Sequence, residues 1–134
     1  MTDARRPDPR GPDPRRPDPR RVVGRAGEDA VAEWYAAAGY TVLDRNWRVR
    51  EGELDLVVRD ARTIAFCEVK TRRGDAFGLP VEAVTARKRQ RLRLLAGRWL
   101  DAHDGGAGSL RFDVASVRPD GQGGWEVEML ANAF

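Results

Sequence analysis

The chain has 134 residues, a formal net charge of +3 and a single cysteine, Cys67. Its length suits one domain with a core of its own, and the lone cysteine excludes an intrachain disulfide and a zinc site built from several cysteines. No segment approaches the roughly 18 apolar residues of a membrane helix, and the first twenty residues lack the apolar stretch of a signal peptide. We therefore expect a cytoplasmic protein.

Residues 1–21 form a repetitive segment of Arg, Pro and Asp that contains six of the eight prolines. Because proline has no amide hydrogen to donate and favours extended backbone, we predict a disordered tail. The tail carries seven Arg and four Asp, which leaves 17 basic and 17 acidic residues in the domain predicted over residues 22–134. Since this domain is neutral overall, its net charge gives no separate indication of nucleic-acid binding.

The first predicted element of the domain is a helix over residues 24–38. Val31, Trp34 and Ala38 fall on one apolar stripe of this helix, and Gly39 is a natural stop. Three strands rich in Val, Leu, Ile and Phe are predicted to follow, over residues 41–49, 53–59 and 63–71. In the first strand, one face is expected to carry Thr41, Leu43, Trp47 and Val49.

The second half of the domain is predicted to contain one helix and two strands. The helix runs from about residue 85 to 102, with Thr85 as its cap. Its buried stripe is expected to contain Leu92, Leu95, Ala96 and Trp99. Strands over residues 110–117 and 125–130 flank a turn at Pro119-Asp120-Gly121. The order α-β-β-β-α-β-β predicts an α/β domain with a mixed sheet flanked by helices.

The second and third strands carry charged residues where a buried strand is normally apolar. Side chains alternate along a strand, so Glu68 and Lys70 share one face. If the intervening turn is centred on residues 61–62, Asp55 lies opposite Glu68 and Glu53 lies opposite Lys70. Opposed carboxylates repel, and a bound Mg²⁺ reverses that interaction. The pattern indicates a metal site at Asp55 and Glu68, with Lys70 beside it to orient water or neutralise a phosphate.

A second interpretation of the same residues is an exposed hairpin with scattered charges, because Glu-x-Lys is a common pattern. Against it stand the apolar residues 64–67, which place Glu68 in a strand expected to be central, where an acid is costly to bury. A turn with an odd number of residues would also separate Asp55 from Glu68. From the residues alone, both interpretations stay open.

Lysine is rare in this chain, because 22 of the 24 basic residues are Arg and only Lys70 and Lys88 are Lys. A Lys ammonium is a compact charge, whereas the Arg guanidinium is planar. The Lys at position 70, beside Glu68, therefore favours a specific role. For Lys88, chance is an equal explanation.

A series of motifs occurs in order along the chain: Gly24-Arg25-Ala26-Gly27-Glu28, Arg45-Asn46, Gly52-Glu53-Leu54-Asp55-Leu56-Val57, Phe66-Cys67-Glu68-Val69-Lys70-Thr71-Arg72, Phe77-Gly78, Lys88, Arg111-Phe112-Asp113 and Asn132-Ala133-Phe134. Together they closely resemble the YraN family, small bacterial proteins predicted to be endonucleases and related in fold to archaeal Holliday junction resolvases. The resemblance covers about residues 22–134 and leaves the tail outside.

This resemblance implies a restriction-endonuclease-like core of the PD-(D/E)xK type, with the element order α-β-β-β-α-β. It implies that Asp55 and Glu68 bind Mg²⁺ or Mn²⁺, that Lys70 is the catalytic lysine and that Glu28 supplies a third carboxylate. Without it, Glu28 is explained by the favourable interaction of an acid with a helix N-terminus. Leu54 departs from the Pro of the general motif, and Cys67 replaces an aliphatic residue on the face turned away from the site.

Five basic residues lie between positions 87 and 93, at the start of the second predicted helix. Since a helix N-terminus attracts phosphate, Lys88 and Arg87 are predicted nucleic-acid contacts, together with Arg72 and Arg73 after the third strand. The alternative is a solvated helix face. Asp113 is expected either to be a buried partner of Arg111 or to support the site.

We therefore expect a Mg²⁺- or Mn²⁺-dependent endonuclease that hydrolyses phosphodiester bonds in DNA, with branched DNA as one candidate substrate. A non-catalytic nucleic-acid-binding module is the alternative, since a fold does not imply a function. A third reading is an adaptor protein whose acidic hairpin binds no ligand. DNA versus RNA and monomer versus homodimer stay open, and no membrane partner is expected.

Overall fold

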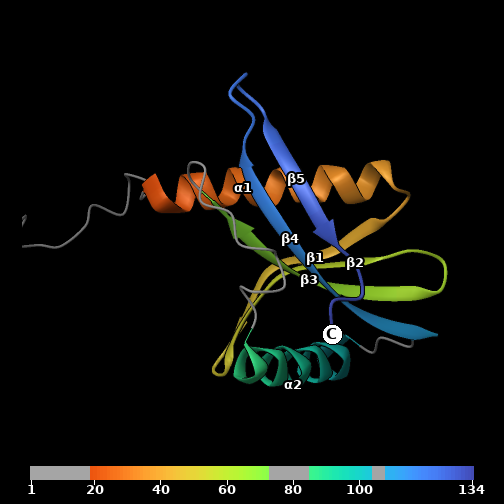
Figure 1. Ribbon diagram of the computed structural model, residues 1–134. Helices are drawn as coiled ribbons and strands as arrows, with labels where there is room; N and C mark the ends of the chain where they lie inside the picture. The colour runs from red at the N-terminus through yellow and green to blue at the C-terminus, as the bar shows by residue number, and fades with distance from the viewer. Residues whose placement is uncertain (1–18, 73–84, 104–107) are drawn as a thin grey trace, which may run out of the picture.

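The computed structural model describes residues 19–72, 85–103 and 108–134. Two helices and one five-stranded mixed sheet make an α/β fold (Figure 1). In chain order the elements are α1 (Pro19–Ala37), β1 (Thr41–Val49), β2 (Gly52–Arg59), β3 (Thr63–Thr71), α2 (Ala86–His103), β4 (Ser109–Pro119) and β5 (Trp125–Leu130). This is the predicted order of elements.

The strands lie in the sheet in their sequence order, β1-β2-β3-β4-β5. Neighbours are antiparallel except for β3 and β4, which are parallel along the whole length of β3, from Thr63 opposite Ser109 to Thr71 opposite Val117. A parallel pair needs a crossover connection, and α2 lies in the segment that joins these two strands. The mixed sheet follows directly from this one helical crossover.

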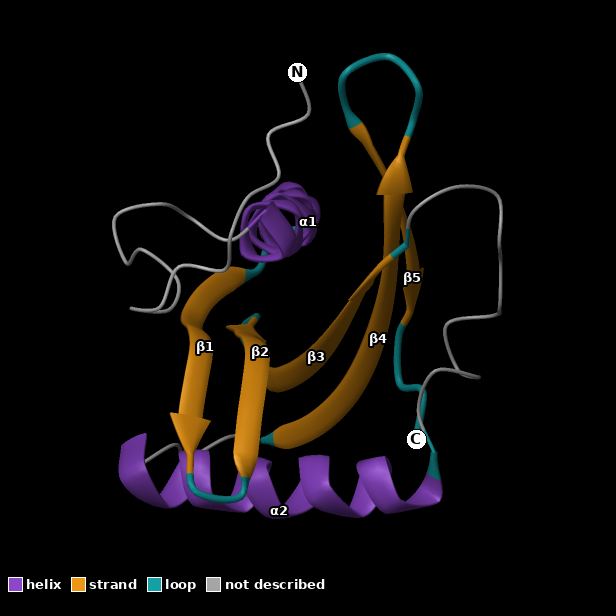
Figure 2. Ribbon diagram, turned by 90° about the vertical axis from the view of Figure 1, so that its left-hand side faces the viewer, coloured by secondary structure: helices purple, strands orange, loops and turns teal. Residues whose placement is uncertain are grey.

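The two helices cover opposite faces of the sheet, as Figure 2 shows. Along β3, Ile64 and Phe66 pack in the core under α2, whereas Ala65 and Cys67 pack in the core under α1. This alternation is the one expected of a strand buried on both sides. By the same alternation, Glu68 follows Phe66 onto the face covered by α2.

The helix α1 differs from the prediction at its start and in its buried stripe. It begins at Pro19 instead of residue 24. Proline suits the first position of a helix, where its missing N–H needs no partner. The fully buried side chains are Val31 and Tyr35, four residues apart, while Trp34 is 40% exposed. Val31 was predicted correctly, but the prediction that Trp34 and Ala38 belong to the stripe was wrong, because the stripe continues from Val31 to Tyr35 and both of these residues are exposed.

The strand β1 has the predicted bounds but not the predicted single face. Its register with β2 shifts between Val42 and Asp44. Because a one-residue shift changes which side chains face the core, Leu43 is exposed whereas Trp47 and Val49 pack under α2.

The helix α2 agrees with the prediction in its cap and its buried residues. Thr85 Oγ1 accepts a hydrogen bond from Lys88 N–H at 3.2 Å, as expected of an N-cap. The buried side chains are Leu92, Leu95, Ala96 and Trp99.

Three predicted features cannot be compared with the structure. Most of the predicted tail, Arg73 and the Phe77-Gly78 motif lie outside the described residues. Among the helices that are described, none has the length and apolar character needed to cross a membrane.

Candidate metal centre

The strands β2 and β3 separate at the predicted site. Their last pair is Leu56 with Cys67, in the register predicted from an even turn. Beyond this pair, Asp55 Oδ2 accepts a hydrogen bond from Val69 N–H at 2.8 Å. The Asp55 carboxylate therefore accepts the hydrogen bond that a backbone carbonyl of β2 would accept in a regular strand pair. Its side chain lies between the two strands where they diverge.

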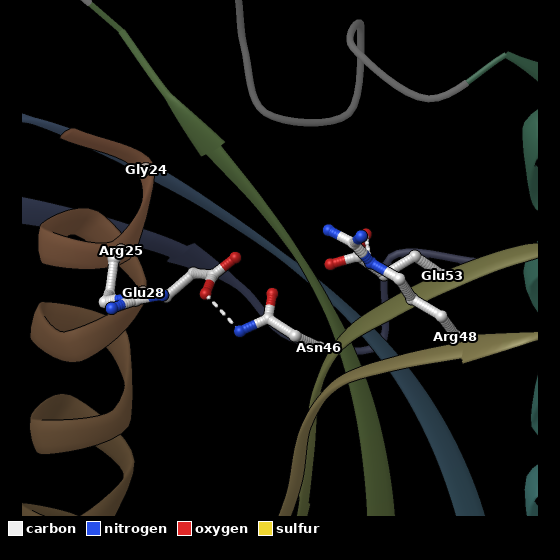
Figure 3. A pocket seen from close by; sticks show the side chains of 6 residues that line it. All are labelled: Gly24, Arg25, Glu28, Asn46, Arg48 and Glu53. Atoms are coloured by element: carbon white, nitrogen blue, oxygen red, sulfur yellow. Dashed lines mark hydrogen bonds and ion pairs between the residues drawn. The ribbon is translucent and has the colours of Figure 1, made fainter. Parts of the chain in front are cut away.

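Three carboxylates converge at this point, from Glu28, Glu53 and Asp55. Each offers an oxygen that lies within 4.8 Å of the other two. Two of them come from β2, whereas Glu28 comes from α1, and Figure 3 shows Glu28 and Glu53 on opposite sides of one pocket. All three side chains are half-buried. We call these residues the acidic cluster.

Glu28 is held in the acidic cluster by close helix packing and by a polar side chain of β1. At Gly27, a Cβ atom would lie 2.5 Å from Thr71 Oγ1, so α1 approaches β3 more closely than a larger residue permits. Asn46 Nδ2 donates a hydrogen bond to Glu28 Oε2 at 2.9 Å (Figure 3). Asn46 has a φ of 52°, a left-handed conformation that Asn tolerates better than most residues.

A pocket of about 230 Å³ opens beside the acidic cluster. Its lining consists of Gly24, Arg25, Glu28, Asn46, Arg48 and Glu53 (Figure 3). Arg48 Nε contacts Glu53 Oε2 at 3.0 Å, and Arg45 Nη2 lies 4.0 Å from Glu28 Oε2. These two arginines thus partly neutralise the carboxylates of Glu28 and Glu53.

Asp55 has no cationic partner among the described residues. Burial raises the pKa of its carboxyl to about 8, and the neighbouring carboxylates of Glu68, Glu28 and Glu53 add to this increase against the opposing Val69 hydrogen bond. Burial also raises the pKa of Glu28. A carboxylate that is costly to ionise in the protein alone becomes favourable to ionise beside a bound cation.

Glu68 lies outside the acidic cluster and has two lysine partners. Its Oε1 is 2.6 Å from Lys88 Nζ and 3.5 Å from Lys70 Nζ, and its side chain is only 9% exposed. Lys88 belongs to the first turn of α2, which covers this face of the sheet. Burial, together with the adjacent Lys88, lowers the pKa of Lys70 despite the attraction of Glu68.

The structure therefore divides the predicted site residues into two neighbouring groups. Asp55 and Glu28 lie in the acidic cluster, whereas Glu68 and Lys70 lie with Lys88. Arg87, a predicted nucleic-acid contact, is exposed on α2. Arg72 is half-buried, and its backbone N–H donates to Val117 O at 2.7 Å.

Sequence analysis missed Glu53 and Asn46 as members of the site. Glu53 was placed opposite Lys70, but the divergence of β2 and β3 directs it to Asp55 and Glu28 instead. The available signal was the alternation along β2, which puts Glu53 and Asp55 two residues apart on one face. For Asn46, its motif was noted, but its left-handed backbone was not evident.

Asp113 is a buried structural residue. Its carboxylate accepts two hydrogen bonds of 2.8 Å from Arg111, one of 2.6 Å from the Tyr35 hydroxyl and one of 2.9 Å from Asn132 N–H. Of the two roles left open by the sequence, Asp113 is thus the buried partner of Arg111. It also ties α1 and the C-terminal segment to β4.

Comparison with known proteins gives a family but no activity. The sequence model of the uncharacterised protein family UPF0102 matches residues 27–117 of this chain. A UPF0102 protein of Frankia casuarinae is 51% identical over 112 residues, which cover 84% of this chain and 95% of that protein. A UPF0102 protein of Nocardia farcinica is 56% identical over 95 residues, which cover 71% of this chain and 75% of that protein.

Among solved structures, the chain is similar to SfsA of Pyrococcus furiosus in complex with Ca²⁺, at 15% sequence identity and a TM-score of 0.33. The match covers 84% of this chain and 62% of that one, less than two thirds of its length.

Proposed function

The chain belongs to the UPF0102 family, and we propose that it is a divalent-metal-dependent endonuclease that hydrolyses phosphodiester bonds in DNA, with branched DNA among its substrates. The observation that carries this proposal is the acidic cluster beside Glu68 and Lys70. Metal-assisted phosphodiester hydrolysis requires carboxylates that bind the metal, a lysine beside them and a pocket that admits a charged ligand.

The donor set of the acidic cluster fits Mg²⁺ or Mn²⁺. Its three converging carboxylates offer only oxygen atoms, which these ions prefer, and no sulfur or imidazole ligand is among them. Asp55 is the most strongly buried member and has no cationic partner among the described residues, so a cation there offsets its cost of ionisation.

Each charged group has a separate role in the proposed reaction. Glu28 of α1 and Glu53 and Asp55 of β2 would hold the cation. When bound, it would supply Lewis-acid polarisation of the phosphate and lower the pKa of water. The Lys70 ammonium, on β3, neutralises charge that develops on the phosphate oxygens. Lys88, Arg72 and Arg87 are proposed contacts to the phosphate backbone.

The order of elements supports the further proposal that this is a restriction-endonuclease-like domain of the PD-(D/E)xK type, as in the YraN family. Its α-β-β-β-α-β order and mixed sheet agree with that core. Asp55 on β2 and Glu68-x-Lys70 on β3 stand at the motif positions, and Glu28 adds the carboxylate from the first helix.

The decisive experiment is cleavage of labelled linear, flapped and four-way-junction DNA by the full chain, with Mg²⁺ or Mn²⁺ and with a chelator. We expect metal-dependent cutting that falls at least about a hundredfold in Asp55→Asn and Lys70→Met, the scale of losing a key electrostatic group. Glu126→Gln is the matched control, because Glu126 is an exposed carboxylate of β5 paired with Arg118. The control should cut like the wild type.

Failure of the wild type to cut any substrate with either metal would contradict the proposal. Metal-independent DNA binding without cleavage would then favour the non-catalytic binding module. Absence of both cleavage and DNA binding would favour the adaptor. Cutting of RNA but not DNA would correct the substrate class.

A further inference from the structure

The charges around Glu68 and Asp55 are distributed unevenly. Glu68 is approached by two ammonium groups, from Lys88 at 2.6 Å and Lys70 at 3.5 Å. Asp55, which comes just beyond the last β2–β3 pair of Leu56 with Cys67, accepts only the Val69 N–H among the described residues. Glu68 is therefore paired with two ammonium groups, while Asp55 interacts with Lys88 only at longer range and forms no ion pair among the described residues.

We propose that Glu68 is a further ligand of the divalent cation held by the acidic cluster, and that Lys88 competes with the cation for it: Lys88 occupies this carboxylate until the cation binds and is then released to contact a phosphate of the nucleic acid. This inference rests on the metal centre of the proposed function and deepens it. In this inference Lys88 first holds the Glu68 carboxylate in place. That role is additional to the general attraction of a basic helix for phosphate.

The contact geometry supports exchange rather than a permanent structural ion pair. The Glu68 side chain is 9% exposed, so loss of a cationic partner is costly unless another cation replaces it. Lys70 Nζ lies 3.5 Å from the same carboxylate oxygen, so Glu68 has a second cation beside it when Lys88 leaves. The Lys88 side chain is 29% exposed, so its ammonium can turn toward solvent without disturbing the buried core of α2.

The position of Lys88 in α2 explains where its ammonium goes. It lies in the first helical turn, and its backbone N–H bonds to the cap residue Thr85. A helix N-terminus favours an anion, and a released ammonium there adds a second attraction for phosphate. The same lysine thus restrains Glu68 before the cation binds and binds the substrate backbone afterwards.

The first test measures Mn²⁺ affinity by calorimetry on the full chain. Lys88→Met removes the competing charge, so we expect the Kd for Mn²⁺ to fall about tenfold, the value of one charge-assisted hydrogen bond. Lys88→Arg keeps a cation beside Glu68 and should bind Mn²⁺ within about twofold of the wild type. Arg87→Met is the matched control for loss of charge from the same helix turn, since Arg87 is exposed.

The second test uses the scarcity of lysine in this chain. Because Lys70 and Lys88 are the only two lysines, acylation by an amine-specific reagent followed by mass spectrometry reports on each of them. We expect Mn²⁺ to increase the acylation rate of Lys88 severalfold in the wild type. In Glu68→Gln the rate should be high with and without the cation.

The outcomes separate this inference from the proposed function. Mn²⁺ binding that is tighter in Lys88→Met, together with faster Lys88 acylation, supports the exchange even if no DNA is cut. An unchanged or weaker Mn²⁺ affinity in a folded Lys88→Met protein overturns the exchange even if the wild type cuts DNA. Equal effects of Lys88→Met and Arg87→Met overturn it as well, because they would reflect helix charge alone. A wild type that binds no Mn²⁺ overturns both proposals.

Discussion

At the scale of single residues, Asp55 links the stability of the fold to its proposed chemistry. Its carboxylate accepts a hydrogen bond from Val69 N–H where the β2–β3 pairing ends. It is nevertheless buried beside other carboxylates, which makes its ionised form costly. A residue chosen only for stability would be neutral here, since an Asn amide oxygen can accept the same hydrogen bond. The proposed cation would account for an acid at this position.

Because burial makes ionisation of Asp55 costly, we predict that Asp55→Asn stabilises the protein to a degree that depends on pH. Burial raises the pKa of Asp55 from 3.8 to about 8, so between these values the folded protein keeps a proton that the unfolded chain has lost. The contribution of Asp55 to stability therefore falls as pH rises through this window. In chelator, Asp55→Asn should exceed the wild type at pH 9 by about 1–3 kcal/mol, with a smaller difference at pH 5. Denaturant unfolding at the two pH values measures it.

The control for this prediction is Asp60→Asn, in the turn of the same hairpin. Hydrogen bonds from Arg62 N–H and Thr63 N–H lower the pKa of Asp60, so its contribution to stability is present at high pH and is lost as pH falls. Asp60→Asn should therefore reduce stability at pH 9. If Asp55→Asn and the wild type differ equally at pH 5 and pH 9, the raised pKa of Asp55 is refuted.

At the scale of elements, the packing of α1 on β3 determines whether Glu28 reaches the acidic cluster. The contact of Gly27 with Thr71 brings the helix close, and Asn46 of β1 then binds the Glu28 carboxylate. Glycine usually weakens a helix, so its presence here is explained by the close approach and not by helix stability.

We predict that Gly27→Ala displaces α1 and weakens Mn²⁺ binding severalfold. Alanine favours the helix by about 1 kcal/mol, but its Cβ atom would lie 2.5 Å from Thr71 Oγ1, so the helix or the threonine must move. Gly97→Ala in α2 is the matched control, because its Cβ would meet no atom within 4 Å and Gly97 does not line the pocket. Calorimetric titration of Mn²⁺ measures the effect.

The double variant Gly27→Ala/Thr71→Ala should recover most of the lost Mn²⁺ affinity, since it removes the obstructing hydroxyl. Equal Mn²⁺ affinity of Gly27→Ala and Gly97→Ala would argue against a positioning role for the α1–β3 contact.

At the scale of the whole molecule, the proposed metal centre joins parts that are distant in sequence. The acidic cluster combines α1 with β2, and the neighbouring Lys88 comes from α2 on the other face of the sheet. Such a site exists only in the folded chain, so ligand binding there stabilises the fold as a whole.

We therefore predict that excess Mn²⁺ raises the free energy of unfolding of the wild type. At a concentration of 100 times Kd, the increase should be about 2.7 kcal/mol. Thermal and denaturant unfolding with Mn²⁺ or chelator measure it. The increase should vanish in Asp55→Asn and persist in Glu126→Gln. An equal increase in all three proteins would point to Mn²⁺ binding elsewhere on the surface.

Local patterns in the sequence were sufficient for most of the architecture. The bounds of β1, β3 and β5, the buried stripe of α2 and the β2–β3 register all follow from alternation, helical spacing and turn length, which depend on near neighbours in the chain. The exposed Trp34 and the shifted face of β1 did not follow, because a one-residue change of stripe or register depends on what packs against the element.

In the candidate site, too, some features could be predicted from local sequence and others depend on the tertiary structure. Asp55, Glu68 and Lys70 stand out as charges in apolar strands, whatever the rest of the chain does. The inclusion of Glu53 in the acidic cluster and the pairing of Glu68 with Lys88 depend on where β2 and β3 diverge and on how α2 crosses their face. These contacts join residues far apart in sequence, and carboxylates and ammonium groups carry no local pattern that specifies a distant partner.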